Sequence, residues 1–204
     1  MTEYRTGYRM RNMLKYCLAL IWLSMSLISG WVSAEVINGE EAQTGLRTWE
    51  WREAGVSVQL VQRLPDQTRA FFQGRGFSTA ESDSIARACV FQTIFRNDGK
   101  HPLVYDLDDW RITYQGKHRS LLTRERWDEK WQAEEANQTA RIAFRWSLLP
   151  TRQGFESGDY NWGMTSFGLP PGESFDLSLN LTINGNVIAR SIPGIVCAAD
   201  QPGN

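Results

Sequence analysis

The stretch from Cys89 to Trp110 limits the possible folds more than any other part of the chain. It reads as an apolar segment, a turn-forming segment and a second apolar segment. Apolar side chains fall on both faces of the first segment, which is typical of a strand buried on both sides. Asn97, Asp98 and Gly99 tolerate positive φ, and Pro102 ends the turn because it cannot donate to a strand ladder. The pattern predicts a hairpin at the centre of a β-sandwich.

Other strands are predicted wherever apolar and polar residues alternate between turn residues. These segments are residues 56–61, 68–77, 110–114, 118–122, 140–148, 175–181, 187–192 and 195–197. Asn184-Gly185 is the strongest hairpin signal. Residues 150–171 carry four glycines and are expected to form a long irregular loop.

Two short helices are predicted as insertions. Ser78 and Glu81 fit a capping box at the start of the first, which would run to about Ala88. The second would begin after Thr123 and place Trp127 and Trp131 on one face. The expected fold is therefore all-β, an immunoglobulin-like β-sandwich of about eight short antiparallel strands with two short inserted helices.

Residues 1–34 have the pattern of a signal peptide, which leaves a single domain at residues 35–204. Four basic residues precede an apolar run from Leu18 to Leu27, and Val32-Ser33-Ala34 offers small residues for cleavage. An uncleaved membrane anchor is the alternative, but the serines in the run and the cleavage site favour removal. No later segment is apolar enough to span a membrane. We expect a periplasmic or secreted protein.

Removal of that segment makes the chain mildly acidic. It takes four basic residues and one acidic residue from the 22 and 23 of the whole chain, which leaves 18 and 22. A domain with this balance lacks the basic surface typical of nucleic-acid binding.

Cys89 and Cys197 are the cysteines of the mature domain, and an even number in an exported protein predicts a disulfide. A metal pair is the alternative, but His101 and His118 are the only histidines and no Cys-x-x-Cys occurs. A blue-copper site would need a free thiolate and two nearby histidines, which makes copper handling a minor alternative. No metal ligand and no cofactor is assigned.

The sequence contains no motif of a known catalytic site, so no catalytic residue is predicted and we expect a protein that is not an enzyme. Its most unusual feature is tryptophan, with seven in the mature domain. Trp110 and Trp146 are predicted to lie in the core. Large aromatic residues outside regular strands are candidates for a binding surface. The candidate binding residues are Trp49, Trp51, Tyr160, Trp162 and Met164.

These features favour an exported, non-catalytic protein that binds another envelope or secreted protein, as an accessory or assembly factor of a bacterial envelope. A carbohydrate-binding module is the main alternative, because indole faces stack on sugar rings.

Overall fold

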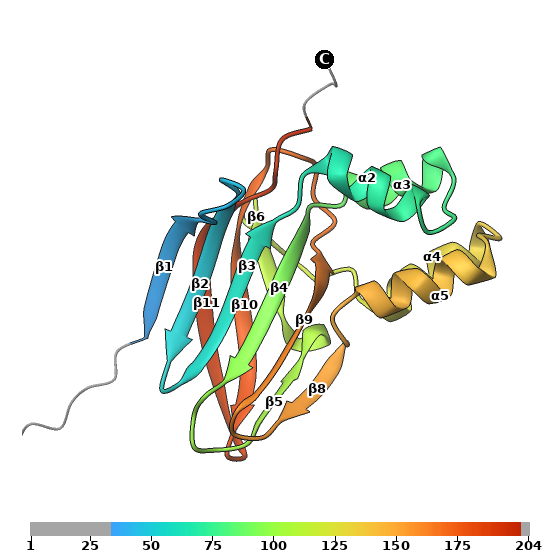
Figure 1. The fold of residues 1–204 in the computed structure, drawn as a ribbon. Helices are drawn as coiled ribbons and strands as arrows, with labels where there is room; N and C mark the ends of the chain where they lie inside the picture. Colours follow the sequence, from blue (N-terminus) through green and yellow to red (C-terminus); the bar gives the residue numbers. More distant parts are fainter. Residues whose placement is uncertain (1–33, 201–204) are drawn as a thin grey trace, which may run out of the picture. The chain divides into compact units, whose positions relative to one another are not determined.

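Two antiparallel β-sheets are the largest part of the computed structural model, which describes residues 34–200 (Figure 1). All of the predicted signal segment except Ala34 lies outside these residues. The first sheet has the strand order β1-β2-β3-β4-β9. Its strands are β1 (Glu35–Glu40), β2 (Arg47–Glu53), β3 (Val56–Gln62), β4 (Val90–Asn97) and β9 (Asp159–Ser166).

The second sheet has the order β7-β6-β10-β5-β8, and β11 also pairs with β10. Its strands are β5 (Leu103–Asp106), β6 (Arg111–Tyr114), β7 (Lys117–Arg119), β8 (Arg152–Phe155), β10 (Ser174–Ile183) and β11 (Asn186–Val196), and a short 3-10 helix, η1 (Leu107–Asp109), joins β5 to β6. The prediction of a mostly β, two-sheet protein is confirmed. The predicted turn at Asn184-Gly185 is also confirmed, because it connects β10 to β11 and both of its residues have positive φ.

Side chains from both sheets form one core between them. Alternate residues of β3 and β4 face the second sheet, where Phe95 stacks on Tyr105 with ring centroids 4.9 Å apart. Burial of such aromatic surface is the main favourable contribution to folding. The two sheets therefore hold together through a shared apolar layer.

The predicted central hairpin is wrong, because β4 and β5 do not pair. β4 pairs with β3 and β9, whereas β5 pairs with β8 and β10. Asn97 is fully buried at the crossing, and its amide nitrogen donates to the carbonyls of His101 and Glu156 over 2.9 and 3.1 Å. The buried amide holds the chain in a path from one sheet to the other, where a tight turn would have kept both strands in one sheet.

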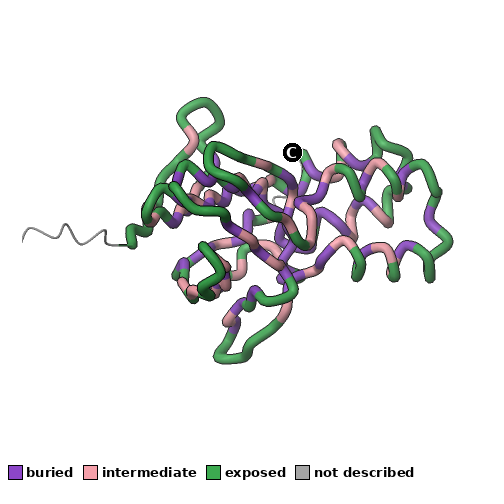
Figure 2. Tube along the Cα trace, turned by 90° about the horizontal axis from the view of Figure 1, so that it is seen from below, coloured by how far each residue is buried: buried purple, intermediate pink, exposed green. Residues whose placement is uncertain are grey.

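Four α-helices in the described residues pack at one end of the outer face of the first sheet and are called the helical layer below (Figure 1). They are α2 (Pro65–Gln73), α3 (Thr79–Ala86), α4 (Arg124–Ala133) and α5 (Gln138–Ser147). A second apolar core lies among them and includes Val90 of β4. Trp127 and Trp131 stack within it at 5.1 Å, as their spacing predicts. In Figure 2 the helical turns alternate between buried and exposed positions, as expected of helices with one buried face.

Two of these helices replace predicted strands. α2 begins at Pro65 with Asp66 in its first turn, and Thr68 and Phe72 are buried four residues apart. In α5, the Asn137 side chain accepts from the amides of Thr139 and Ala140 and starts the helix. Apolar and polar residues alternate over residues 140–148 as in a strand, but residues 140–147 belong to a helix, so the predicted strand is wrong.

The predicted α3 and α4 are confirmed. Ser78 and Glu81 form the expected capping box at the start of α3. No helix within residues 34–200 combines the length and hydropathy needed to cross a bilayer.

The predicted disulfide is present between Cys89 and Cys197. Cys89 directly precedes β4 of the first sheet, and Cys197 directly follows β11 of the second. The bond therefore joins the two sheets across a separation of 108 residues. A covalent link of this span restricts the unfolded chain strongly.

Replacement of both cysteines by serine should lower the free energy of unfolding by about 2–5 kcal/mol, because the unfolded chain regains the entropy of a long closed loop. Urea denaturation of the variant and of the wild type, each with and without reductant, measures this loss. Wild type in reductant should match the variant. Equal midpoints for all four samples would contradict a stabilising disulfide.

An ion pair also connects the sheets at one side of the core. Arg190 of β11 donates to both carboxylate oxygens of Glu53 of β2 over 2.5 and 2.7 Å. This hydrogen bonding holds the pKa of Glu53 below its ordinary value. A lowered pKa in the folded state stabilises the fold at pH values above the unfolded pKa, and the gain is lost as the pH falls through the folded pKa.

Glu53→Gln should therefore lower the thermal midpoint at neutral pH, and the difference in midpoint between variant and wild type should shrink as the pH falls below the ordinary glutamate pKa of about 4.3. Thermal denaturation followed across this pH range tests the expectation. Glu40→Gln on β1 is the control, since Glu40 forms no ion pair with a residue of the described part. A pH-independent difference between Glu53→Gln and wild type would refute the linkage.

Candidate binding site

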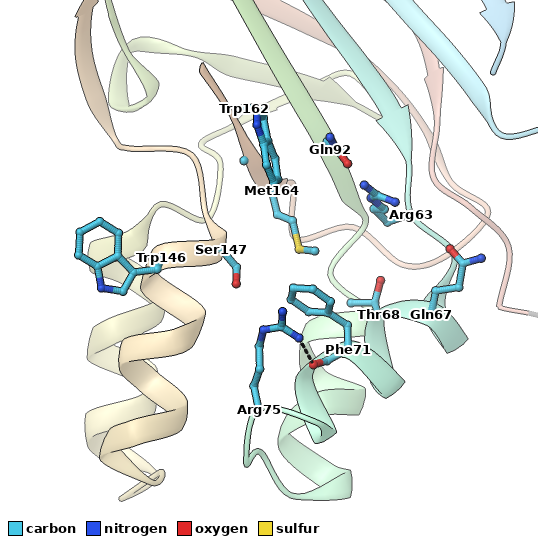
Figure 3. A pocket seen from close by; sticks show the side chains of 11 residues that line it. Arg63, Gln67, Thr68, Phe71, Arg75, Gln92, Trp146, Ser147, Trp162 and Met164 are labelled. Carbon is cyan, nitrogen blue, oxygen red and sulfur yellow. Dashed lines mark hydrogen bonds between the residues drawn. The ribbon is translucent and has the colours of Figure 1, made fainter. Parts of the chain in front are cut away.

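A cavity of about 450 Å³ opens between α2, the end of α5 and the outer face of the first sheet (Figure 3). Its volume lies in the range of sites that hold small molecules or short segments of a partner. The residues that line it are Arg63, Gln67, Thr68, Phe71, Arg75, Gln92, Trp146, Ser147, Trp162, Gly163 and Met164.

Strand β9 supplies the sheet side of this cavity. It is an edge strand, and its residues Tyr160, Trp162 and Met164 share the outer face because side chains alternate along a strand. Trp162 lies opposite Ile94 of β4 and is 61% exposed. Tyr160 is equally exposed and lies under the guanidinium of Arg96, 5.1 Å from its ring centroid.

Helix α5 supplies the second side because of a close crossing of two backbones. After α5 the chain passes beside β9, and the amide of Leu149 donates to the carbonyl of Met164 over 2.9 Å. A Cβ at Gly163 would lie only 2.4 Å from the Leu149 nitrogen, so this crossing requires glycine. The crossing brings the end of α5, with Trp146 and Ser147, next to β9.

Trp146 was predicted to lie in the core, and this is wrong. It is 81% exposed on α5. The helix buries Ala140 and Phe144, which are four residues apart, and this leaves Trp146 on the solvent side. Trp146 is therefore a functional candidate that the sequence interpretation missed. It lies at the rim of the cavity, and Figure 3 shows its indole pointing away from Met164 and Phe71.

Phe71 and two arginines supply the third side. The Arg75 guanidinium stacks on the Phe71 ring, 3.3 Å from its centroid, and donates to the Phe71 carbonyl over 2.9 Å. Arg63 lies between β3 and α2 and is half-buried. Its Nε atom is buried and has no hydrogen-bond partner in the described structure. Burial lowers the pKa of the Arg63 guanidinium, and the field of Glu41 opposes this shift.

The predicted binding residues divide into two groups. Trp162 and Met164 line the cavity, and Tyr160 lies beside them on the same strand face. Trp49 and Trp51 are each 1% exposed and belong to the core between the sheets, so their assignment to a binding surface is wrong. Their alternation with Glu50 places both indoles on the inner face of β2, opposite Leu60 and Val58 of β3.

The cavity lining offers stacking, charge and hydrogen bonding. It contains no histidine and no carboxylate, and its one serine, Ser147, donates to the carbonyl of Ala143 within α5. Within residues 34–200, no three His, Cys, Asp or Glu residues lie close enough together to hold a metal ion. The disulfide also takes up both thiols that a blue-copper site could have used. The aromatic, arginine and amide side chains that line the cavity are suited to binding a ligand.

Comparison with known proteins gives no match to a protein-family model, a curated protein or a solved structure.

Gly163→Ala should destabilise the protein by about 1–3 kcal/mol, because the new methyl group would overlap the Leu149 backbone and force strand and helix apart. Chemical denaturation measures the loss. Gly154→Ala on β8 is the matched control, since the nearest atom to its Cβ would be 3.8 Å away. Equal stability of the two variants would show that the crossing tolerates a side chain.

Proposed function

We propose that this protein is an exported, non-catalytic binding protein that captures a polypeptide partner at the cavity between α2, α5 and β9. The observation that carries the proposal is the gathering of exposed aromatic residues there. Trp146 and Trp162 line the cavity and Tyr160 lies next to it, and these are the exposed aromatic residues of the described chain. An accessory or assembly role in a bacterial envelope is the setting we propose.

Solvent exposure of three large aromatic side chains is unfavourable unless a partner covers them. Tryptophan, tyrosine and arginine are the residues that contribute most to protein interfaces. Ile142 lies one turn before Trp146 on α5 and is also exposed, so the apolar surface continues along the helix. A partner could therefore bury the cavity and its surroundings together.

An oxidising compartment and an immunoglobulin-like sandwich belong to the same proposal. The disulfide between the sheets supports export to the periplasm or the medium, because such bonds persist where thiols are not kept reduced. The shared core between two antiparallel sheets supports the sandwich class. Cleavage after residue 34 is the matching expectation for the signal segment, and the N-terminal residue of the exported protein tests it.

Carbohydrate binding is the second candidate, and the two exposed indoles at one cavity favour it. Sugar rings stack on flat aromatic faces, and Gln67 and Gln92 could hydrogen-bond to hydroxyl groups. Binding to a glycan array that is lost in Trp162→Ala would favour this function. A protein that binds no glycan but retains an envelope protein would favour the first.

Substitution of both Trp146 and Trp162 by alanine should weaken partner binding at least about 30-fold, because central tryptophans of an interface contribute about 2 kcal/mol or more each. The exported protein is immobilised, exposed to envelope extract and analysed by quantitative mass spectrometry. The affinity for the recovered partner is then measured with purified components.

Val187→Ala is the matched control, since Val187 is an exposed apolar residue on the distant β10–β11 hairpin. Both variants should keep the wild-type thermal midpoint because all three side chains are exposed. Recovery of the same partner, with equal affinity, by the double variant would exclude the cavity as the binding site.

A further inference from the structure

Two guanidinium groups reach the cavity without a carboxylate partner. Arg63 and Arg75 both line it, and the lining contains no acidic residue. The ion pairs of residues 34–200 include neither of them. Figure 3 shows the two side chains on different sides of the cavity, with Phe71 between them. The cavity therefore has two guanidinium groups without a direct ion-pair partner beside its aromatic surface, and the Glu41 carboxylate outside the lining acts on Arg63 only through its field.

A nearby arginine shows that this helical layer does satisfy guanidinium groups elsewhere. Arg69 of α2 forms ion pairs with Asp66, Asp83 and Asp200 at 2.6–2.8 Å. Arg63 instead keeps a buried Nε atom without an acceptor. A half-buried cation loses hydration, and an anion that enters the cavity would offset this cost.

The position of Arg75 is also suited to an anion. Its stacking on Phe71 and its bond to the Phe71 carbonyl hold the guanidinium plane in place and use only one of its N–H groups. The remaining donors can bind a carboxylate through two parallel hydrogen bonds. Because the side chain is already held, less conformational entropy is lost when it binds.

The edge of β9 favours a polypeptide as the source of this anion. Main-chain bonds from Leu149 and Leu122 cover the edge at Met164 and Ser166. The Trp162 amide donates to the side-chain oxygen of Asn161 over 2.8 Å. No main-chain group of residues 34–200 hydrogen-bonds to the edge at this residue. An extended segment that adds to this edge would gain backbone hydrogen bonds and run beside the cavity.

Building on the proposed function, we propose that the cavity recognises an acidic residue of the partner polypeptide. Arg75 binds its carboxylate, Arg63 contributes positive charge from the other side of the cavity, and a neighbouring apolar or aromatic side chain of the same segment packs against Trp162, Met164 and, at the rim, Trp146. The recognised chemistry is thus a carboxylate next to an apolar side chain in an extended segment.

An array of immobilised octapeptides in matched pairs tests this chemistry. Each pair differs only in Glu or Gln at one position beside Leu, Phe or Trp, and bound protein is detected by antibody. The strongest pairs are then titrated in solution by fluorescence anisotropy. We expect each Glu peptide to bind at least roughly tenfold more tightly than its Gln counterpart, because charge-assisted hydrogen bonds are lost in the latter.

Arg75→Gln should remove most of the preference for the Glu peptide over its Gln counterpart, and Arg63→Gln should reduce the same preference. Arg126→Gln is the control, because Arg126 lines a separate cavity beside α3 and α4. Arg75 is exposed, so Arg75→Gln alone carries the test if Arg63→Gln does not fold.

The possible failures are distinguishable. Equal binding of Glu and Gln peptides, lost in the Trp146 and Trp162 double variant, would overturn the acidic recognition and leave the proposed function standing. A Glu preference that survives both arginine substitutions would also overturn it. Absence of binding to every peptide would overturn the inference, and the proposed function would fall with it only if the immobilised protein also retained no envelope protein.

Discussion

Strand β4 is buried along its whole inner face and, on its outer face, at Val90, and the arrangement of the molecule depends on this double packing. Phe91 and Phe95 pack between the sheets, whereas Val90 on the opposite face belongs to the core of the helical layer. One strand thus takes part in two apolar cores. Because β9 pairs with β4 along eight residues, the orientation of Trp162 at the cavity follows from the packing of a neighbouring strand that cannot rotate.

Local chemistry was predictable from the sequence, and pairing between distant segments was not. The capping box at Ser78 and the turn at Asn184 each rest on a few neighbouring residues, and both are present. The apolar residues of 140–148 fit both a strand and a helix pattern. The Asn137 side chain caps the first amides of the helix and so favours the helical conformation. The separation of β4 and β5 into different sheets depends on Asn97, whose buried contacts involve residues some 60 positions away.

The candidate site was predictable only on its sheet side. Tyr160, Trp162 and Met164 stand at alternate positions, so their common face follows from any extended conformation. The glycine-rich segment around them was expected to be a loop, although Gly163 is required by the crossing of Leu149 beside a regular strand. Trp146 comes from α5, and Arg63 and Arg75 flank the two ends of α2, so only the folded chain brings them to β9.

The stacked indoles of Trp127 and Trp131 give this protein a built-in optical signal. Two parallel indoles with centroids 5.1 Å apart should show exciton coupling in circular dichroism. The pair lies in the core of the helical layer and not between the disulfide-linked sheets. Loss of this band before loss of the β-sheet signal on heating would show that the helical layer opens as a separate cooperative unit.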